Sequence, residues 1–234
     1  MSGTPRDTER PVGSRRGAEL RLYALGIDEA RELFAVPEGR RDRFRDLARG
    51  ELGLTPQKDR SRLWAALFRH DPHSSPARSI DPDAPTMDDV EALLTGRHAG
   101  VDRNVARWRV TETLISARAH DRLCLQAGPE LVDAADFSLT ILGAPAALSI
   151  RTLIDTPAML PLLPLSGVRL GYVRGSVAEA MAQTYATHAP QLKEPDRRAL
   201  VSDLADWLGH YPEWAARAAQ QGRPAPDLLT FAFS

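Results

Sequence analysis

The sequence is poor in cysteine and in long apolar runs, and each shortage excludes a class of protein. Cys124 is the only cysteine among 234 residues, so no disulfide can form within the chain, which suits a reducing compartment. The longest apolar stretch, Met159–Leu165, is interrupted by two prolines and is far shorter than the roughly 20 residues that span a membrane. We therefore expect a cytoplasmic protein without a membrane partner.

Lysine is almost missing as well. Lys58 and Lys193 are the only lysines among 30 basic residues, and the formal net charge is -1. Such a balance does not draw the whole molecule onto nucleic acid. The most arginine-rich segment, residues 40–49, also contains Asp42 and Asp46, which interrupt a basic surface. We expect no nucleic-acid partner.

The common catalytic signatures are missing too. The chain contains no GxSxG, no Walker A loop, no GxGxxG after a strand, no CxxC and no HExxH. The flanks of Cys124 are apolar, which predicts a buried and inert thiol rather than a nucleophile. These absences disfavour a familiar enzyme, and we expect no cofactor.

Three short segments have the composition of β-strands: Glu19–Leu25, Val168–Val173 and Asp227–Ser234. Strands need partners for their backbone N–H and C=O groups, so these segments are expected to meet in one sheet. The sequence therefore predicts a single α+β domain over residues 18–234, mostly helical, with a small three-stranded sheet that includes the C-terminal strand. Residues 1–17 hold almost no apolar side chains and are predicted to be a disordered tail.

Helical periodicity fills the stretches between the strands. The clearest pattern covers Asp102–Arg122, which is predicted to be the central helix. Capping boxes at Thr86 and Ser176 predict two helix starts. Two units, Leu20–Phe34 and Val168–Tyr185, share one design: a short apolar strand, a glycine and a helix. The remaining helices are predicted at residues 28–35, 38–49, 59–69, 129–137, 143–154, 196–209 and 212–221.

A long loop is predicted at residues 70–85, with four prolines. Loops of this length inside a domain are often functional. Two histidines and several carboxylates, including His70 and Asp71, are of the types that bind divalent cations. Their spacing matches no established ligand set, and prolines after two of the aspartates are typical of turns. We therefore predict no metal site.

One helix carries a second group of candidate residues. Arg109 and Glu112 lie one helical turn apart beside Trp108, a spacing that allows an ion pair. Such a pair indicates either a fixed core network or a polar pocket. A ligand site would combine Trp108, Arg109 and Glu112 with His70 and Asp71 of the long loop.

The late aromatic residues Trp207, Tyr211 and Trp214 have two interpretations. They could line a cleft, because ligand pockets are rich in aromatic side chains. Large aromatic residues in mostly helical domains usually fill the core, however. The core interpretation is the one we adopt for this cluster.

Three segments carry a family resemblance: LRLYALGIDEARELF, VRLGYVRGSVAEAMAQTY and WAARAAQQGRPAPDLLTFAFS. Their order of strand–helix, strand–helix and helix–strand resembles the YfbM-like proteins, a bacterial family of unknown function. The central stretch that begins LFRHDPHSSPARSIDPDAP is similar to a set of uncharacterised actinobacterial proteins. The resemblance implies an α+β fold and a bacterial, cytoplasmic setting. The family has no established catalytic residues, so none is carried over.

The predicted function is a non-enzymatic protein-interaction or regulatory module with a protein partner, for example of the immunity type. A well-patterned core without a chemical motif favours this hypothesis. The alternative is an enzyme or a small-ligand binder with a pocket near Trp108, Arg109 and Glu112.

Overall fold

The computed structural model describes residues 18–54, 81, 83–97 and 100–234. Three predictions lie wholly or largely outside these ranges: the tail at residues 1–17, the helix at residues 59–69 and the loop at residues 70–85. His70 and Asp71 belong to that loop. No helix in the described ranges combines the length and the apolar character needed to cross a membrane.

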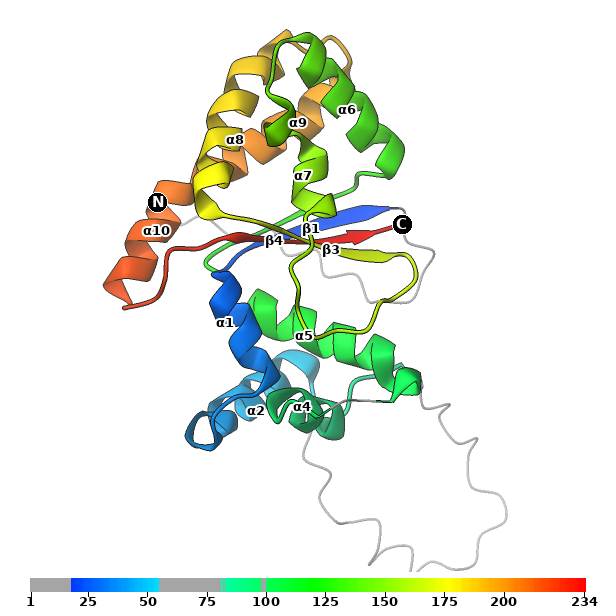
Figure 1. Ribbon diagram of the computed structural model, residues 1–234, viewed down its shortest axis with the longest axis vertical. Helices are drawn as coiled ribbons and strands as arrows, with labels where there is room; N and C mark the ends of the chain where they lie inside the picture. The colour runs from blue at the N-terminus through cyan, green and yellow to red at the C-terminus, as the bar shows by residue number, and fades with distance from the viewer. Residues whose placement is uncertain (1–17, 55–80, 82, 98–99) are drawn as a thin grey trace, which may run out of the picture.

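The described strands form one antiparallel sheet of four, in the order β2-β1-β4-β3. Helices account for most of the other described residues, so the prediction of a mostly helical α+β fold is confirmed (Figure 1). The prediction of three strands is corrected to four. The strands are β1 (Glu19–Ala24), β2 (Arg122–Leu125), β3 (Val168–Val173) and β4 (Leu228–Phe233).

The additional strand, β2, lies where the sequence predicts the end of the central helix. That helix, α5 (Asn104–Arg118), ends four residues before the predicted end at Arg122. The chain then becomes extended, and the His120 N–H donates to the Ala24 carbonyl at 2.8 Å. The four-residue segment RLCL is too short for periodicity to separate strand from helix. Pairing with β1 decides its conformation.

The strand also corrects the prediction for Cys124, which is exposed rather than buried. Successive strand residues point to opposite faces of the sheet. Leu123 and Leu125 point toward one core, so Cys124 between them points the other way. Apolar flanks therefore indicated the burial of the neighbours and not of the thiol.

The sheet separates two apolar cores. Leu20, Leu22 and Ala24 of β1 belong to one core, whereas Tyr23 and Leu25 belong to the other, as the alternation of a strand requires. We call the helices over the first core the upper layer: α6 (Pro129–Ile141), α7 (Ile150–Asp155), α8 (Gly175–His188), α9 (Pro195–Leu208) and α10 (Tyr211–Gln220). The lower layer holds α1 (Ile27–Arg31), α2 (Glu38–Leu52), α4 (Met87–Leu94) and α5 (Figure 1).

Local signals set several helix ends. Thr86 forms the predicted capping box with Asp89: the Asp89 N–H donates to the Thr86 hydroxyl, and the Thr86 N–H donates to the Asp89 carboxylate. The capping box predicted at Ser176 is not formed, because α8 begins at Gly175 after Arg174 and no side chain within the motif caps it. Short 3-10 helices occur at Glu32–Phe34, Val101–Arg103, Ala146–Leu148 and Ala189–Gln191.

Helix α7 of the upper layer lies directly against the sheet at Gly171 of β3. A Cβ at this position would lie 1.9 Å from the Leu153 carbonyl oxygen of α7. Glycine is therefore required here, because any side chain would push α7 away from the strand.

The topology leaves an opening at one end of the sheet. Strands β1 and β3 both run antiparallel to β4, which lies between them, so they end at the same edge. After β1 the chain enters α1 in the lower layer, and after β3 it enters α8 in the upper layer (Figure 1). Ligands of α/β proteins commonly bind where successive connections diverge to opposite faces. This edge is the place to look for a site.

Candidate functional site

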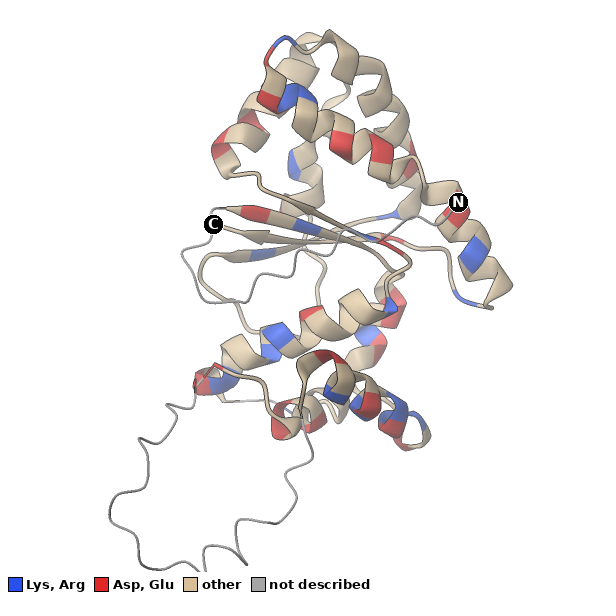
Figure 2. Cartoon of the chain, turned by 180° about the vertical axis from the view of Figure 1, so that it is seen from behind, with Lys and Arg blue, Asp and Glu red and all other residues tan. Residues whose placement is uncertain are grey.

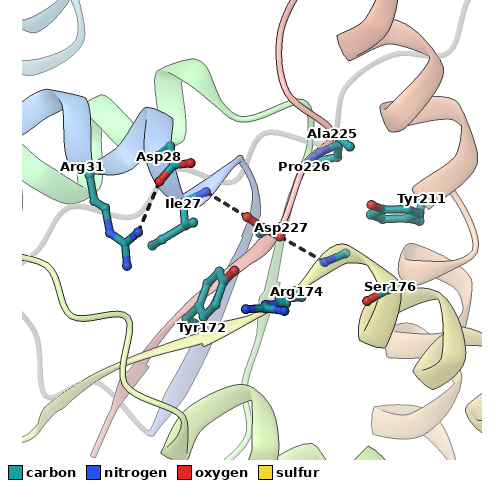
Figure 3. Close-up of a pocket in the computed structure, with 11 residues that line it drawn as sticks. Ile27, Asp28, Arg31, Tyr172, Arg174, Ser176, Tyr211, Ala225, Pro226 and Asp227 are labelled. Carbon is teal, nitrogen blue, oxygen red and sulfur yellow. Dashed lines mark hydrogen bonds and ion pairs between the residues drawn. The ribbon is translucent and has the colours of Figure 1, made fainter.

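A groove of about 530 Å³ occupies this edge (Figure 3). Its volume lies within the range of roughly 300 to 1,000 Å³ that is usual for ligand pockets. Its walls come from α1, from the end of β3 with the start of α8, from α10 and from the segment that leads into β4. The polar residues that line it are Asp28, Arg31, Tyr172, Arg174, Ser176, Tyr211 and Asp227.

Asp227 connects the start of α1 to the start of α8, which lie on opposite walls of the groove. One carboxylate oxygen accepts from the Ile27 N–H at 3.0 Å and the other accepts from the Gly175 N–H at 3.1 Å (Figure 3). Ile27 and Gly175 are the first residues of α1 and α8, and such N–H groups have no partner within their own helix. A carboxylate also interacts favourably with helix N-termini. One side chain therefore fixes the start of a lower helix against the start of an upper one.

Gly175 allows the walls to approach each other. A Cβ there would lie 1.9 Å from the Tyr211 hydroxyl oxygen and 2.5 Å from the Pro226 carbonyl oxygen. No side chain fits in that space, so the position requires glycine. The close approach brings the Tyr211 hydroxyl, from α10, next to the N-terminus of α8.

The two tyrosines of the groove are hydrogen-bond donors at neutral pH. Burial raises the pKa of Tyr172, and the nearby charge of Asp227 adds to that increase, whereas Arg174 and Arg31 oppose it. Burial and Asp227 likewise raise the pKa of Tyr211. Both hydroxyls therefore keep their protons and can donate to an acceptor in the groove.

The charged residues of the groove are not equally available. Arg31 pairs with Asp28 at 3.2 Å (Figure 3), and Asp227 accepts the two backbone N–H groups. Arg174 is exposed, and its side chain is hydrogen-bonded to the side chain of Tyr172. The guanidinium has further N–H groups that can donate to a ligand.

The candidates predicted on α5 contact different segments of the chain. The Trp108 indole N–H donates to the Leu163 carbonyl at 2.8 Å, and the Trp108 ring packs edge-on against Phe231. Arg109 donates to the Asp83 carbonyl at 2.9 Å. Glu112 does not pair with Arg109, because it accepts from Arg21 and Tyr23 of β1 instead. The three side chains thus interact with three different segments.

Glu112 belongs to a closed network on the lower face of the sheet. Arg21 donates to Glu112 at 2.7 Å and to Glu19 at 2.9 Å, and the Cys124 thiol donates to Glu19 at 2.6 Å. Although Cys124 is exposed as a residue, partial desolvation of its thiol and the hydrogen bond to Glu19 raise its pKa to about 11. The thiol is therefore protonated at neutral pH and is a poor nucleophile, so the network is structural rather than reactive.

The late aromatic cluster is divided between core and groove. Trp207 and Trp214 are buried, with ring centroids 4.7 Å apart, as the core interpretation predicts. Tyr211 packs against Trp214 with its ring and also lines the groove. Sequence reasoning missed Arg174, Asp227 and this role of Tyr211. The shared strand–glycine–helix design could have located them. The glycine that follows β1 and the glycine that follows β3 both lie at the edge of the sheet where these two strands end.

The described part of the chain contains no group of three or more His, Cys, Asp or Glu side chains suited to a metal ion. Comparison with protein-family models, with curated proteins and with solved structures finds no match to this chain. The resemblance to the YfbM-like family therefore stays a prediction.

Proposed function

We propose that the protein is a non-enzymatic interaction module and that a segment of a partner protein binds in the groove at the ends of β1 and β3. The observation that carries this proposal is the exposed guanidinium of Arg174, which lies in that groove beside Tyr172, with Tyr211 also lining the groove. Arginine and tyrosine are over-represented among residues that dominate binding energy at protein interfaces.

The state of the polar groups favours binding over chemistry. A general base needs an available carboxylate or imidazole near the operating pH. Asp227 instead accepts two backbone N–H groups, and Asp28 accepts from Arg31. The tyrosines stay protonated. The groove is therefore arranged to hold a ligand by hydrogen bonds.

The alternative pocket near Trp108, Arg109 and Glu112 has weaker support. Each of these side chains is already bonded to a different part of the protein, so a ligand would have to displace native contacts. The single cysteine supports the further proposal of a cytoplasmic setting, where a lone thiol stays reduced.

Native co-purification of the tagged full-length chain from its host, followed by mass spectrometry, tests the proposal. The wild type is compared with Arg174→Glu and with Arg43→Glu, which reverses an exposed charge on α2, away from the groove. We expect a stoichiometric protein partner that is lost with Arg174→Glu and retained with Arg43→Glu. Equal capture by all three chains would contradict a groove-bound partner. A chain that captures nothing and turns over a small molecule would overturn the proposal.

A further inference from the structure

The groove contains hydrogen-bond donors for which α8 supplies no acceptor. The Gly175 N–H is bonded to Asp227, but the next N–H, that of Ser176, lies in the first turn of α8 and has no acceptor within the helix. Ser176, Tyr211 and Arg174 also line the groove, with Arg174 beside Tyr172 (Figure 3). A ligand that satisfies these groups must supply acceptor atoms.

The charged side chains of the groove restrict the chemical class of the ligand further. Arg31 and Asp28 pair with each other, so the remaining charged side chains that line the groove are those of Arg174 and Asp227. A doubly charged phosphate would meet one cation and one carboxylate, and the repulsion from Asp227 would act on both of its charges. A single negative charge matches a single arginine.

We propose that the groove recognises one carboxylate of the partner, carried by an acidic side chain or by a chain terminus, through Arg174 and the N-terminal turn of α8. This inference rests on the proposed function and names the group that is bound. Arginine binds a carboxylate with two parallel hydrogen bonds, and the Tyr211 and Ser176 hydroxyls supply further donors. The aromatic ring of Tyr172 forms the neighbouring wall.

The test is a titration of the full-length protein followed by backbone amide NMR. Three probes are compared: acetylated glutamate amide, which carries a side-chain carboxylate; acetylated glycine, which carries a terminal carboxylate; and inorganic phosphate. We expect saturable shifts at Arg174, Gly175 and Ser176 with at least one of the two carboxylates at millimolar to tens of millimolar concentrations. The probe that binds with the higher affinity indicates whether the groove recognises a side-chain carboxylate or a terminal carboxylate.

Two variants control the titration. Arg174→Gln, which keeps a polar side chain, should weaken carboxylate binding about tenfold or more, since a hydrogen bond to a charged group is lost. Arg43→Gln should leave it unchanged. The inference is overturned if no saturable shift occurs, if Arg174→Gln binds as the wild type does, or if phosphate binds more tightly than both carboxylates. A captured partner that keeps its affinity when its acidic groups are amidated would also overturn it, while leaving the proposed function intact.

Discussion

The upper and lower layers cover opposite faces of one sheet, but different forces hold them. In the lower layer, carboxylates are buried within ion pairs: the side chains of Glu29 and Asp89 are 7% and 6% exposed. In the upper layer, the ion pairs lie at the surface, as in Arg151–Asp133, whose carboxylate is 53% exposed. Charged residues of both signs lie along the lower helices (Figure 2). The comparison indicates that packing fixes the upper layer, whereas charge contributes strongly to fixing the lower one.

Glu29 is the clearest case in the lower layer. It accepts from Arg118 at the end of α5 and from Arg223 in the segment before β4, both at 2.9 Å. Arg223 also donates to the Arg118 carbonyl. Burial works to raise the pKa of Glu29, but the hydrogen bonds from both arginines outweigh it and lower that pKa. Charge therefore anchors α1, one wall of the groove, to two distant segments.

The largest loss of stability is expected from a substitution that disrupts the packing of the upper layer. Gly171→Ala would place a Cβ 1.9 Å from the Leu153 carbonyl of α7. We expect a loss of about 3 kcal/mol in the free energy of unfolding, the upper end of typical overpacking costs. Denaturant unfolding measures it. Gly50→Ala is the control: its Cβ meets nothing within 4 Å, and within a helix it should stabilise by up to about 1 kcal/mol. Equal stability of the two variants would refute the close contact.

The next largest loss of stability is expected when the ion pairs of Glu29 in the lower layer are removed. Glu29→Gln leaves Arg118 and Arg223 without their anion, and we expect a loss of about 2 kcal/mol at neutral pH. This value is below the usual cost of breaking a buried pair, because both arginines retain some solvent contact. Urea unfolding gives the measurement. A loss below about 0.5 kcal/mol, as for a surface pair, would remove the distinction between the layers.

The same anchor predicts a pH dependence. The pKa of Glu29 is lower in the folded protein than its ordinary value of 4.5, so its stabilisation is present above pH 4.5 and is lost as the pH falls through the folded value. Burial and Arg223 also lower the pKa of His120 from 6.5, so stability begins to fall as the pH drops below 6.5. Unfolding measured between pH 7 and pH 3 should show a shallower decline for Glu29→Gln than for the wild type. Parallel curves would contradict this account.

A smaller loss of stability is expected from a substitution at Asp227, where the two layers meet. Asp227→Ala removes the acceptor shared by α1 and α8. We expect a loss of about 1.5 kcal/mol, within the range for a lost N-cap. Hydrogen exchange should then quicken at the Ile27 and Gly175 amides while the core of β4 stays protected. Unchanged exchange at both amides would show that Asp227 does not join the walls.

The smallest effect tests the surface charges of the same lower layer. Asp46→Asn removes the exposed pair with Arg49 on α2. Such pairs contribute little, so we expect a change below about 0.5 kcal/mol in the unfolding free energy, reduced further by salt. A loss as large as that of Glu29→Gln would mean that the burial of the carboxylate is not what matters.

Sequence reasoning found the elements whose signals are local. The bounds of β3 and the capping box at Thr86 follow from a few adjacent residues. It missed β2, because a four-residue segment becomes a strand only through pairing with β1. It also placed the start of α8 on Ser176, since nothing nearby shows that Asp227 caps this helix from 52 residues away.

The groove could not be predicted from the sequence either, because its residues come from distant segments. Ile27 and Asp227, which are bonded to each other, are 200 residues apart, and the remaining polar residues come from separate segments. The pattern on α5 was misleading because helical spacing suggested that Arg109 and Glu112 could pair. Tertiary partners on β1 and at Asp83 bind these two side chains instead.

Site-specific photo-cross-linking in the host tests most directly whether a partner binds between the two layers. One photoreactive residue replaces Asp28, on the rim of the groove, and another replaces Phe137, an exposed apolar residue of α6 in the upper layer. We predict that the Asp28 position cross-links to a single protein partner, and that Arg174→Glu abolishes the cross-link. A partner that cross-links at Phe137 and not at Asp28 would contradict the account and place the interface on the upper layer.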